Sequence, residues 1–119
     1  IARIATSIAH NYNNCSLYVS PRNWRFIGPT APGPQPHATG GEIAEWISSN
    51  QGQSWRQRRV LTSSSPFNHT YVRRPLHAHP DFESFWADGH AFRQSDSHLY
   101  FANSRGEVFR LPPLMTAAA

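Results

Sequence analysis

The residues that decide the fold read EIAEWISSNQGQSWRQRRVL at positions 42–61. Glu42–Ser48 and 54–61 are two short segments with β-branched or aromatic residues, separated by turn residues, which is typical of strands. Between them, 49–53 carries Asn50 and Gly52, two residue types that favour tight turns. This stretch therefore predicts two antiparallel strands joined by a short turn.

The rest of the chain repeats this pattern, with almost no helical periodicity. Turn residues separate six further predicted strands, and the proline- and glycine-rich stretch 29–41 is expected to be an irregular loop. The predicted strands form two groups of four, which is typical of β-propeller blades. His10-Asn11-Tyr12 and His69-Thr70-Tyr71 are a faint internal repeat, for which chance remains an alternative. The further strands are Ser16–Val19, 24–28, 71–74, 82–88, 99–103 and 107–111.

Composition narrows the class of protein. The chain has 119 residues, a hydrophobic fraction of 39% and one cysteine, which excludes a disulfide-stapled mini-protein and disfavours disorder. No apolar run is long enough to span a bilayer, so no membrane partner is expected. The net charge of +4 comes from arginine without lysine. Because these arginines are dispersed and no nucleic-acid motif is present, we expect no nucleic-acid partner. Arginine also suits bidentate recognition of carboxylates.

Two sets of motifs point to one family. Ser48-Ser49-Asn50-Gln51-Gly52-Gln53-Ser54-Trp55 resembles the Asp-box of sialidase-type propellers, with Asn50 in place of the aspartate. In that family the turn is structural and lies away from the catalytic face, and its tryptophan packs between blades. The wider chain resembles the BNR-4 group of repeat proteins, through His10-Asn11-Tyr12, Trp24-Arg25-Phe26-Ile27-Gly28-Pro29-Thr30, Gly40-Gly41-Glu42, Asn68-His69-Thr70-Tyr71-Val72-Arg73-Arg74-Pro75, His79-Pro80-Asp81-Phe82 and Trp86-Ala87-Asp88-Gly89.

The resemblance implies an all-β fold of antiparallel four-stranded blades, in a propeller that has seven blades in this family. The whole chain, 1–119, would be a partial propeller, with blades over about 8–62 and 66–112 and a tail at 113–119. It also implies a secreted or periplasmic carbohydrate-active protein, a lyase or glycoside hydrolase acting on uronate-containing polysaccharide. The alternatives are a non-catalytic glycan-binding propeller and a structural segment that self-associates or completes itself with other blades. We expect the isolated chain to be inactive, because a propeller site takes residues from several blades.

Lyase chemistry on a uronate sets the candidate site residues. The carboxylate must be neutralised, a base must take the C5 proton, and an acid must protonate the leaving oxygen. Histidine and tyrosine suit proton transfer, and arginine suits the carboxylate. The predicted catalytic residues, near the entry to each innermost strand, are His10, Tyr12, His69 and Tyr71. The predicted substrate-binding residues are Asn68, Arg73, Arg74 and His79. Arg73 and Arg74 alternate faces on a strand, so at most one of them can point at a ligand, and the sequence leaves open which one. Structural hydrogen bonding for the histidines and core packing for the tyrosines are the alternatives.

His77 and His79 are the densest ligand-like pair. On an extended segment, His-x-His places both imidazoles on one side. A complete metal site needs further donors, for which Asp88, His90 and Cys15 are candidates. No cofactor is expected to be required. A structural divalent metal is one alternative, and hydrogen bonding within a loop is the other.

Overall fold

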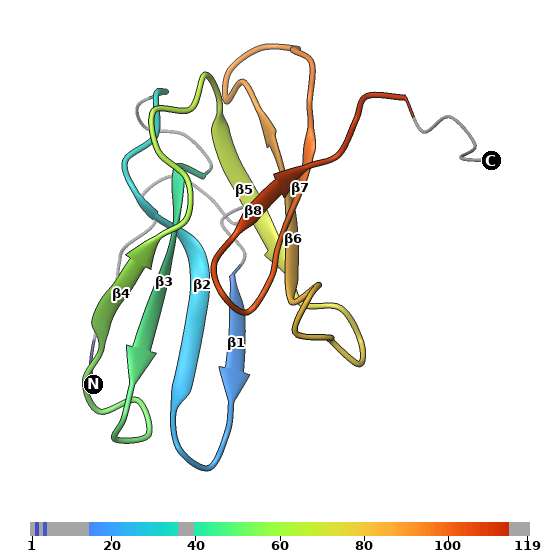
Figure 1. The fold of residues 1–119 in the computed structure, drawn as a ribbon. Coiled ribbons are helices and arrows are strands. Elements are labelled where there is room, and N and C mark those ends of the chain that lie inside the picture. Colours follow the sequence, from blue (N-terminus) through green and yellow to red (C-terminus); the bar gives the residue numbers. More distant parts are fainter. Residues whose placement is uncertain (1, 3, 5–14, 36–39, 115–119) are drawn as a thin grey trace, which may run out of the picture.

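The computed structural model describes residues 2, 4, 15–35 and 40–114. Over these residues the fold is all-β and contains no helix (Figure 1). Eight strands follow one another along the chain, as the sequence predicts. They are β1 Ser16–Val19, β2 Trp24–Ala31, β3 Glu42–Ser48, β4 Arg56–Val60, β5 Asn68–Arg73, β6 Ser84–Gly89, β7 Leu99–Ala102 and β8 Val108–Arg110.

The strands form two separate four-stranded sheets. Sheet A has the order β1-β2-β3-β4 and sheet B the order β5-β6-β7-β8, with every neighbouring pair antiparallel. Each strand therefore pairs with the strand that follows it in the chain, as in a propeller blade. The predicted grouping into four and four is confirmed. The arrangement is consistent with two blades of a propeller.

The prediction of an irregular loop from residue 29 is wrong at its start. β2 continues to Ala31 and includes Pro29, although β2 is a central strand of sheet A. The pairing of β2 with β3 shifts register between Gly28 and Ala31. An irregularity of this kind accommodates a proline because the ladder hydrogen bonds are interrupted there.

The predicted start of β5 is also wrong. This strand begins at Asn68, three residues before the expected start, and its pairing with β6 shifts register between Thr70 and Arg73. Within that shift Tyr71 has a φ of 61°, in the left-handed region. The expected extended segment at His77 and His79 is wrong as well. His77 lies in a turn with a φ of 53°, so the alternation that would align two imidazoles is absent.

Corresponding turns join the last two strands of each sheet. In the β3–β4 turn, the Asn50 Oδ1 atom accepts the Ser54 N–H at 2.9 Å, and Gly52 has a φ of 82°. In the β7–β8 turn, Asn103 Oδ1 accepts the Glu107 N–H at 3.0 Å, and Gly106 also has a φ of 82°. Asparagine and glycine therefore perform the turn chemistry expected of them at both places. Trp55 makes an edge contact with Phe26 of its own sheet, with ring centroids 6.4 Å apart.

The two sheets pack face to face through a small core. The buried hydrophobic side chains come from both sheets and include Ile27 and Ile43 of sheet A and Val72 and Trp86 of sheet B. Two hydrogen bonds tie β1 to sheet B: Ser16 Oγ donates to the Val72 carbonyl at 3.0 Å, and the Tyr18 hydroxyl donates to the Glu83 carbonyl at 2.8 Å. The first strands of the two sheets, β1 and β5, are thereby brought together.

Candidate functional site

A chain of buried hydrogen bonds surrounds the beginning of β5. His69 is 2% exposed, and its Nδ1 atom accepts the indole N–H of Trp86 at 2.9 Å. Its Nε2 atom lies 2.8 Å from Ser65 Oγ. Ser65 Oγ in turn donates to the Glu42 carboxylate at 2.9 Å. Four side chains from the two sheets and from the β4–β5 connection are thus linked in one line; we call them the His69 chain.

The direction of these hydrogen bonds determines the tautomer of His69. Because Trp86 donates to Nδ1, the proton of the neutral ring is on Nε2, and that N–H donates to Ser65. In a nucleophilic serine site the imidazole accepts the serine proton instead. Here the Ser65 hydroxyl donates its hydrogen bond to the Glu42 carboxylate instead. The arrangement therefore holds His69 as a neutral structural donor, and both of its ring nitrogens are engaged.

Burial and hydrogen bonding shift the pKa values of this cluster. Burial lowers the pKa of His69 and outweighs the opposing attraction of Glu42 and Asp88. Burial also opposes ionisation of Glu42, but hydrogen bonds from Thr62 and Ser65 outweigh it and lower the pKa of this carboxyl. Neutral His69 and ionised Glu42 are therefore the favoured states at neutral pH.

Asp88 adds a second buried carboxylate next to the His69 chain. It accepts the Tyr100 hydroxyl at 2.9 Å and the His98 backbone N–H at 2.7 Å. The Tyr100 ring packs against His69 with centroids 4.8 Å apart. Burial, together with the hydrogen bond to Asp88, raises the pKa of Tyr100. This tyrosine is therefore held protonated as a donor to Asp88.

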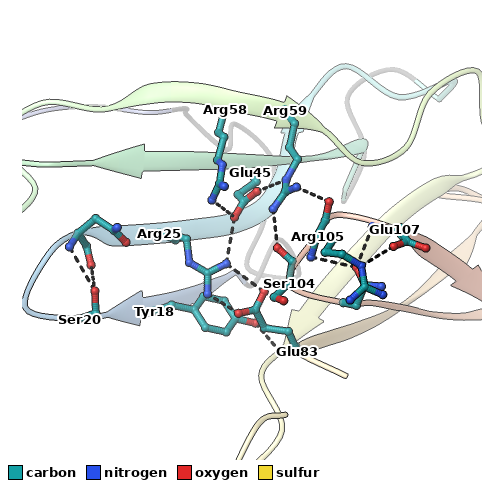
Figure 2. A network of polar contacts seen from close by, with 12 residues as sticks. Tyr18, Ser20, Arg25, Glu45, Arg58, Arg59, Glu83, Ser104, Arg105 and Glu107 are labelled. Carbon is teal, nitrogen blue, oxygen red and sulfur yellow. Dashed lines mark hydrogen bonds and ion pairs between the residues drawn. The ribbon is translucent and has the colours of Figure 1, made fainter. Parts of the chain in front are cut away.

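A different kind of contact joins the sheets farther along the interface (Figure 2). Glu45 of β3 is 1% exposed and accepts a hydrogen bond from Arg25 at 3.0 Å and another from Arg59. Arg25 also donates to Glu83, which precedes β6, at 2.9 Å. These ion pairs raise the pKa of the Arg25 guanidinium. Arg59 donates to the Ser104 carbonyl of the β7–β8 turn at 2.8 Å. We call Arg25, Glu45, Arg59 and Glu83 the ionic network.

The other end of β5 carries exposed cationic side chains. Arg73 lies over the Tyr71 ring with its Cζ atom 5.0 Å from the centroid, and Arg74 lies over the Tyr18 ring at the same distance. Both arginines are exposed, and neither forms an ion pair with a carboxylate in the described part of the chain. The two guanidinium groups therefore stack on tyrosines of different sheets, and no carboxylate of the described residues compensates their charge.

The structure divides the predicted site residues between these two ends. Asn68 and His69 begin β5, and Arg73 ends it. Asn68 is buried, and its Nδ2 donates to the Gln35 carbonyl at 3.2 Å. His10 and Tyr12 lie outside the described residues. The predicted residues that the structure brings together are thus Asn68 with His69, and Tyr71 with Arg73.

The predicted metal ligands belong to a turn. His79 Nδ1 accepts the Asp81 backbone N–H at 3.1 Å, which is the loop hydrogen bonding that the sequence left open. Across residues 15–35 and 40–114, no three histidine, cysteine or acidic side chains come together in a way that could hold a metal ion. Two imidazoles without further donors do not make a tetrahedral site.

Sequence reasoning missed most members of both buried clusters as site residues. Glu42, Trp86 and Asp88 occur within the motifs that resemble the BNR-4 group, but nothing in those motifs assigns them partners. Glu45 gave a usable signal, because an acidic residue flanked by apolar residues in the middle of the strand EIAEWIS is expected to be buried with a cation. The identity of that cation, from β2 or from β4, had no local signal.

Comparison of the chain with protein-family models, with curated proteins and with solved structures finds no match. The resemblance to the BNR-4 group therefore stays a prediction. Within the described residues, no helix is long and apolar enough to cross a membrane.

Proposed function

We propose that this chain is a two-blade propeller segment that binds an acidic, carboxylate-bearing glycan at the end of β5. The observation that carries the proposal is the pairing state of the arginines. The half-buried arginines of the ionic network are paired with carboxylates, whereas exposed Arg73 and Arg74 stack on tyrosines and have no carboxylate partner among the described residues.

Stacking prepares a guanidinium for an external anion. A ring under the guanidinium plane restricts the side chain but leaves the N–H edge available, and that edge matches a carboxylate in a bidentate manner. The proposed site lies between β1 and the end of β5, since Arg74, the residue after β5, lies over the Tyr18 ring of β1. In a propeller these first strands surround the central axis, where ligand sites are found. A uronate is the sugar class that such a site would recognise.

Binding can be measured by calorimetry with a uronate oligosaccharide and with a neutral oligosaccharide of the same length. We expect the uronate to bind and the neutral sugar not to bind. Arg73→Gln with Arg74→Gln should weaken uronate binding at least about tenfold, because a charge-assisted bidentate contact contributes about 1.5–3 kcal/mol. Arg56→Gln is the matched control, since Arg56 is also exposed and has no ion pair among the described residues. Equal affinity for both sugars, or an unaffected double variant, would contradict the proposal.

Catalysis on the same glycan is a second candidate, and the backbone of Tyr71 favours it. A left-handed φ at a non-glycine residue costs about 1–3 kcal/mol and is concentrated at functional sites. In a β-elimination, Arg73 would neutralise the uronate carboxylate while Tyr71 moves a proton at the reacting centre. The Tyr71 oxygen, as phenolate, would take the C5 proton while the bond from C4 to the leaving oxygen breaks and a C4–C5 double bond forms. The resulting Tyr71 phenol would then return that proton to the leaving oxygen.

The polypeptide that contains all blades is the appropriate protein for this assay. A lyase would generate the ultraviolet absorbance of an unsaturated uronate, and Tyr71→Phe should abolish it while retaining uronate binding. New reducing ends without that absorbance would indicate a hydrolase instead. Binding with neither product would leave the glycan-binding function alone.

A further inference from the structure

His98, the residue before β7, is held by a buried carboxylate. Its Nδ1 atom lies 3.2 Å and 3.3 Å from the two oxygens of Asp88, whose side chain is 0% exposed. Because the His98 backbone N–H also donates to Asp88, at 2.7 Å, both the ring and the main chain of His98 are anchored. A carboxylate accepts hydrogen bonds and does not donate them, so the proton of the neutral His98 ring is on Nδ1. Nε2 is therefore a hydrogen-bond acceptor.

This acceptor atom is available to an external molecule. Nε2 lies on the side of the ring that faces away from Asp88, and no donor among the described residues hydrogen-bonds to it. The His98 side chain is 27% exposed, whereas His69 is buried and has a partner at each ring nitrogen. The buried carboxylate also makes Nε2 a stronger acceptor, because its negative charge raises the basicity of the imidazole that it orients. His98 is thus prepared to accept a hydrogen bond.

A pocket of about 260 Å³ adjoins this ring, between the start of β7 and the chain that follows β8. The Leu111 N–H donates to the Leu99 carbonyl at 2.8 Å, which holds the two sides of the pocket together. The hydroxyl of Ser97 already donates to the Asp88 carbonyl at 2.5 Å. The wall is therefore mainly apolar, and His98 offers its strongest hydrogen-bond acceptor. The residues that line the pocket are Ser97, His98, Leu99, Leu111, Pro112 and Pro113.

We propose that this pocket binds a phenol, an aromatic ring that carries a hydroxyl group, with the hydroxyl donating to Nε2 of His98. The leucine and proline side chains receive the ring, and one oriented acceptor receives its O–H, which is the usual division of labour in a small-molecule site. A sugar fits less well, because most of its hydroxyl groups would lie against apolar side chains without partners. No arginine lines the pocket, so a uronate carboxylate would find no cationic partner there.

The pocket is separate from the glycan site proposed above. His98 contacts Asp88 near the end of β6, whereas Arg73 pairs with Phe85 near the start of that strand. Phenol binding and glycan binding can therefore succeed or fail independently.

Titration with two isomeric probes, followed by NMR of the ¹⁵N-labelled chain, tests the proposal. The probes are 4-methylphenol and methoxybenzene, which have the same atoms, but the oxygen of methoxybenzene carries no proton. We expect 4-methylphenol to shift the backbone amide signals of Leu99 and Leu111 and to bind at least about fivefold more tightly than methoxybenzene, because only its O–H can donate to Nε2. Equal affinity for the two probes, or shifts that leave Leu99 and Leu111 unaffected, would overturn the proposal.

His98→Phe keeps a ring beside the pocket and removes the acceptor, so this variant should lose the preference for 4-methylphenol. His77→Phe is the matched control, since His77 is exposed in a turn, and it should keep the wild-type preference. The imidazole ¹⁵N signals of the wild type provide a second measurement that needs no variant. They should show the His98 proton on Nδ1, and 4-methylphenol should shift Nε2 more than Nδ1. A preference that survives His98→Phe, or a wild-type proton on Nε2, would contradict the proposal.

Discussion

Two clusters hold the sheets together, one mainly through a line of hydrogen bonds and the other through ion pairs. The His69 chain consists of a neutral imidazole between an indole N–H and a serine that donates to Glu42. The ionic network instead surrounds buried Glu45 with guanidinium groups and links Arg25 to Glu83. The first depends on each donor meeting one acceptor, whereas the second depends on charge balance. The difference teaches that one interface can combine a cluster that needs a neutral imidazole with a cluster that needs paired charges.

The largest effect is expected from breaking the ionic network at its centre. Glu45→Gln leaves Arg25 and Arg59 next to an uncharged group at a position that is 1% exposed. Removing one partner of a buried ion pair typically destabilises a protein by about 3–5 kcal/mol. Denaturant unfolding followed by tryptophan fluorescence measures this loss. A loss below about 1 kcal/mol would mean that charge balance at Glu45 is not what joins the sheets.

The corresponding change in the His69 chain should lower the free energy of unfolding by a smaller amount. Trp86→Phe keeps an aromatic ring in the core but removes the N–H that donates to His69 Nδ1. A buried acceptor without its donor costs about 1–3 kcal/mol, to which the smaller ring adds a packing loss. The same unfolding measurement gives the value. A cost equal to that of Glu45→Gln would remove the distinction between the two clusters.

Mild acid should lower the stability of the folded protein through the His69 chain. The pKa of His69 is lowered in the folded protein, so below the unfolded-state pKa of about 6.5 the unfolded chain takes up a proton that the folded chain does not. Stability from this residue is therefore fully present above about pH 6.5, and it is lost as the pH falls toward the folded-state pKa. Glu42, whose pKa is also lowered, contributes a second loss below its usual value of 4.5.

Unfolding free energies at a series of pH values between 5 and 8 would show this loss. His69→Gln should flatten the profile in that range. A wild-type profile that His69→Gln leaves unchanged would contradict the assignment of the slope to His69.

The smallest loss of stability is expected at an exposed ion pair, which has the same arginine and glutamate groups as the ionic network but lies in water. Arg105 Nε donates to Glu107 at 2.6 Å, but both side chains are more than half exposed. Exposed pairs contribute little because water and salt screen them. Glu107→Gln should leave the unfolding midpoint unchanged within error. A measurable shift would show that burial is not the feature that distinguishes Glu45 from Glu107.

Local signals predicted much of the fold. The strand-forming residues Ile43, Trp46 and Ile47, together with Asn50 and Gly52 after them, were enough to place a hairpin, because strand propensity and turn chemistry act over a few residues. Four of the eight strands begin at the predicted residue, namely β1, β2, β3 and β7. The start of β5 was misplaced because Tyr71 occupies a register shift, which tertiary packing tolerates and no propensity encodes.

The partners of the buried polar groups were decided only by the tertiary structure. Tyr18 and Glu83 are separated by 65 residues in the chain, and His69 and Trp86 by 17, so no spacing rule connects them. The sequence by itself determined that His69 and the arginines would be present and approximately where in each blade they would lie. Packing of sheet B on sheet A decided which of them became structural. A polar side chain removed from water must find a partner within about 3 Å, and only the folded sheets bring these donors and acceptors that close.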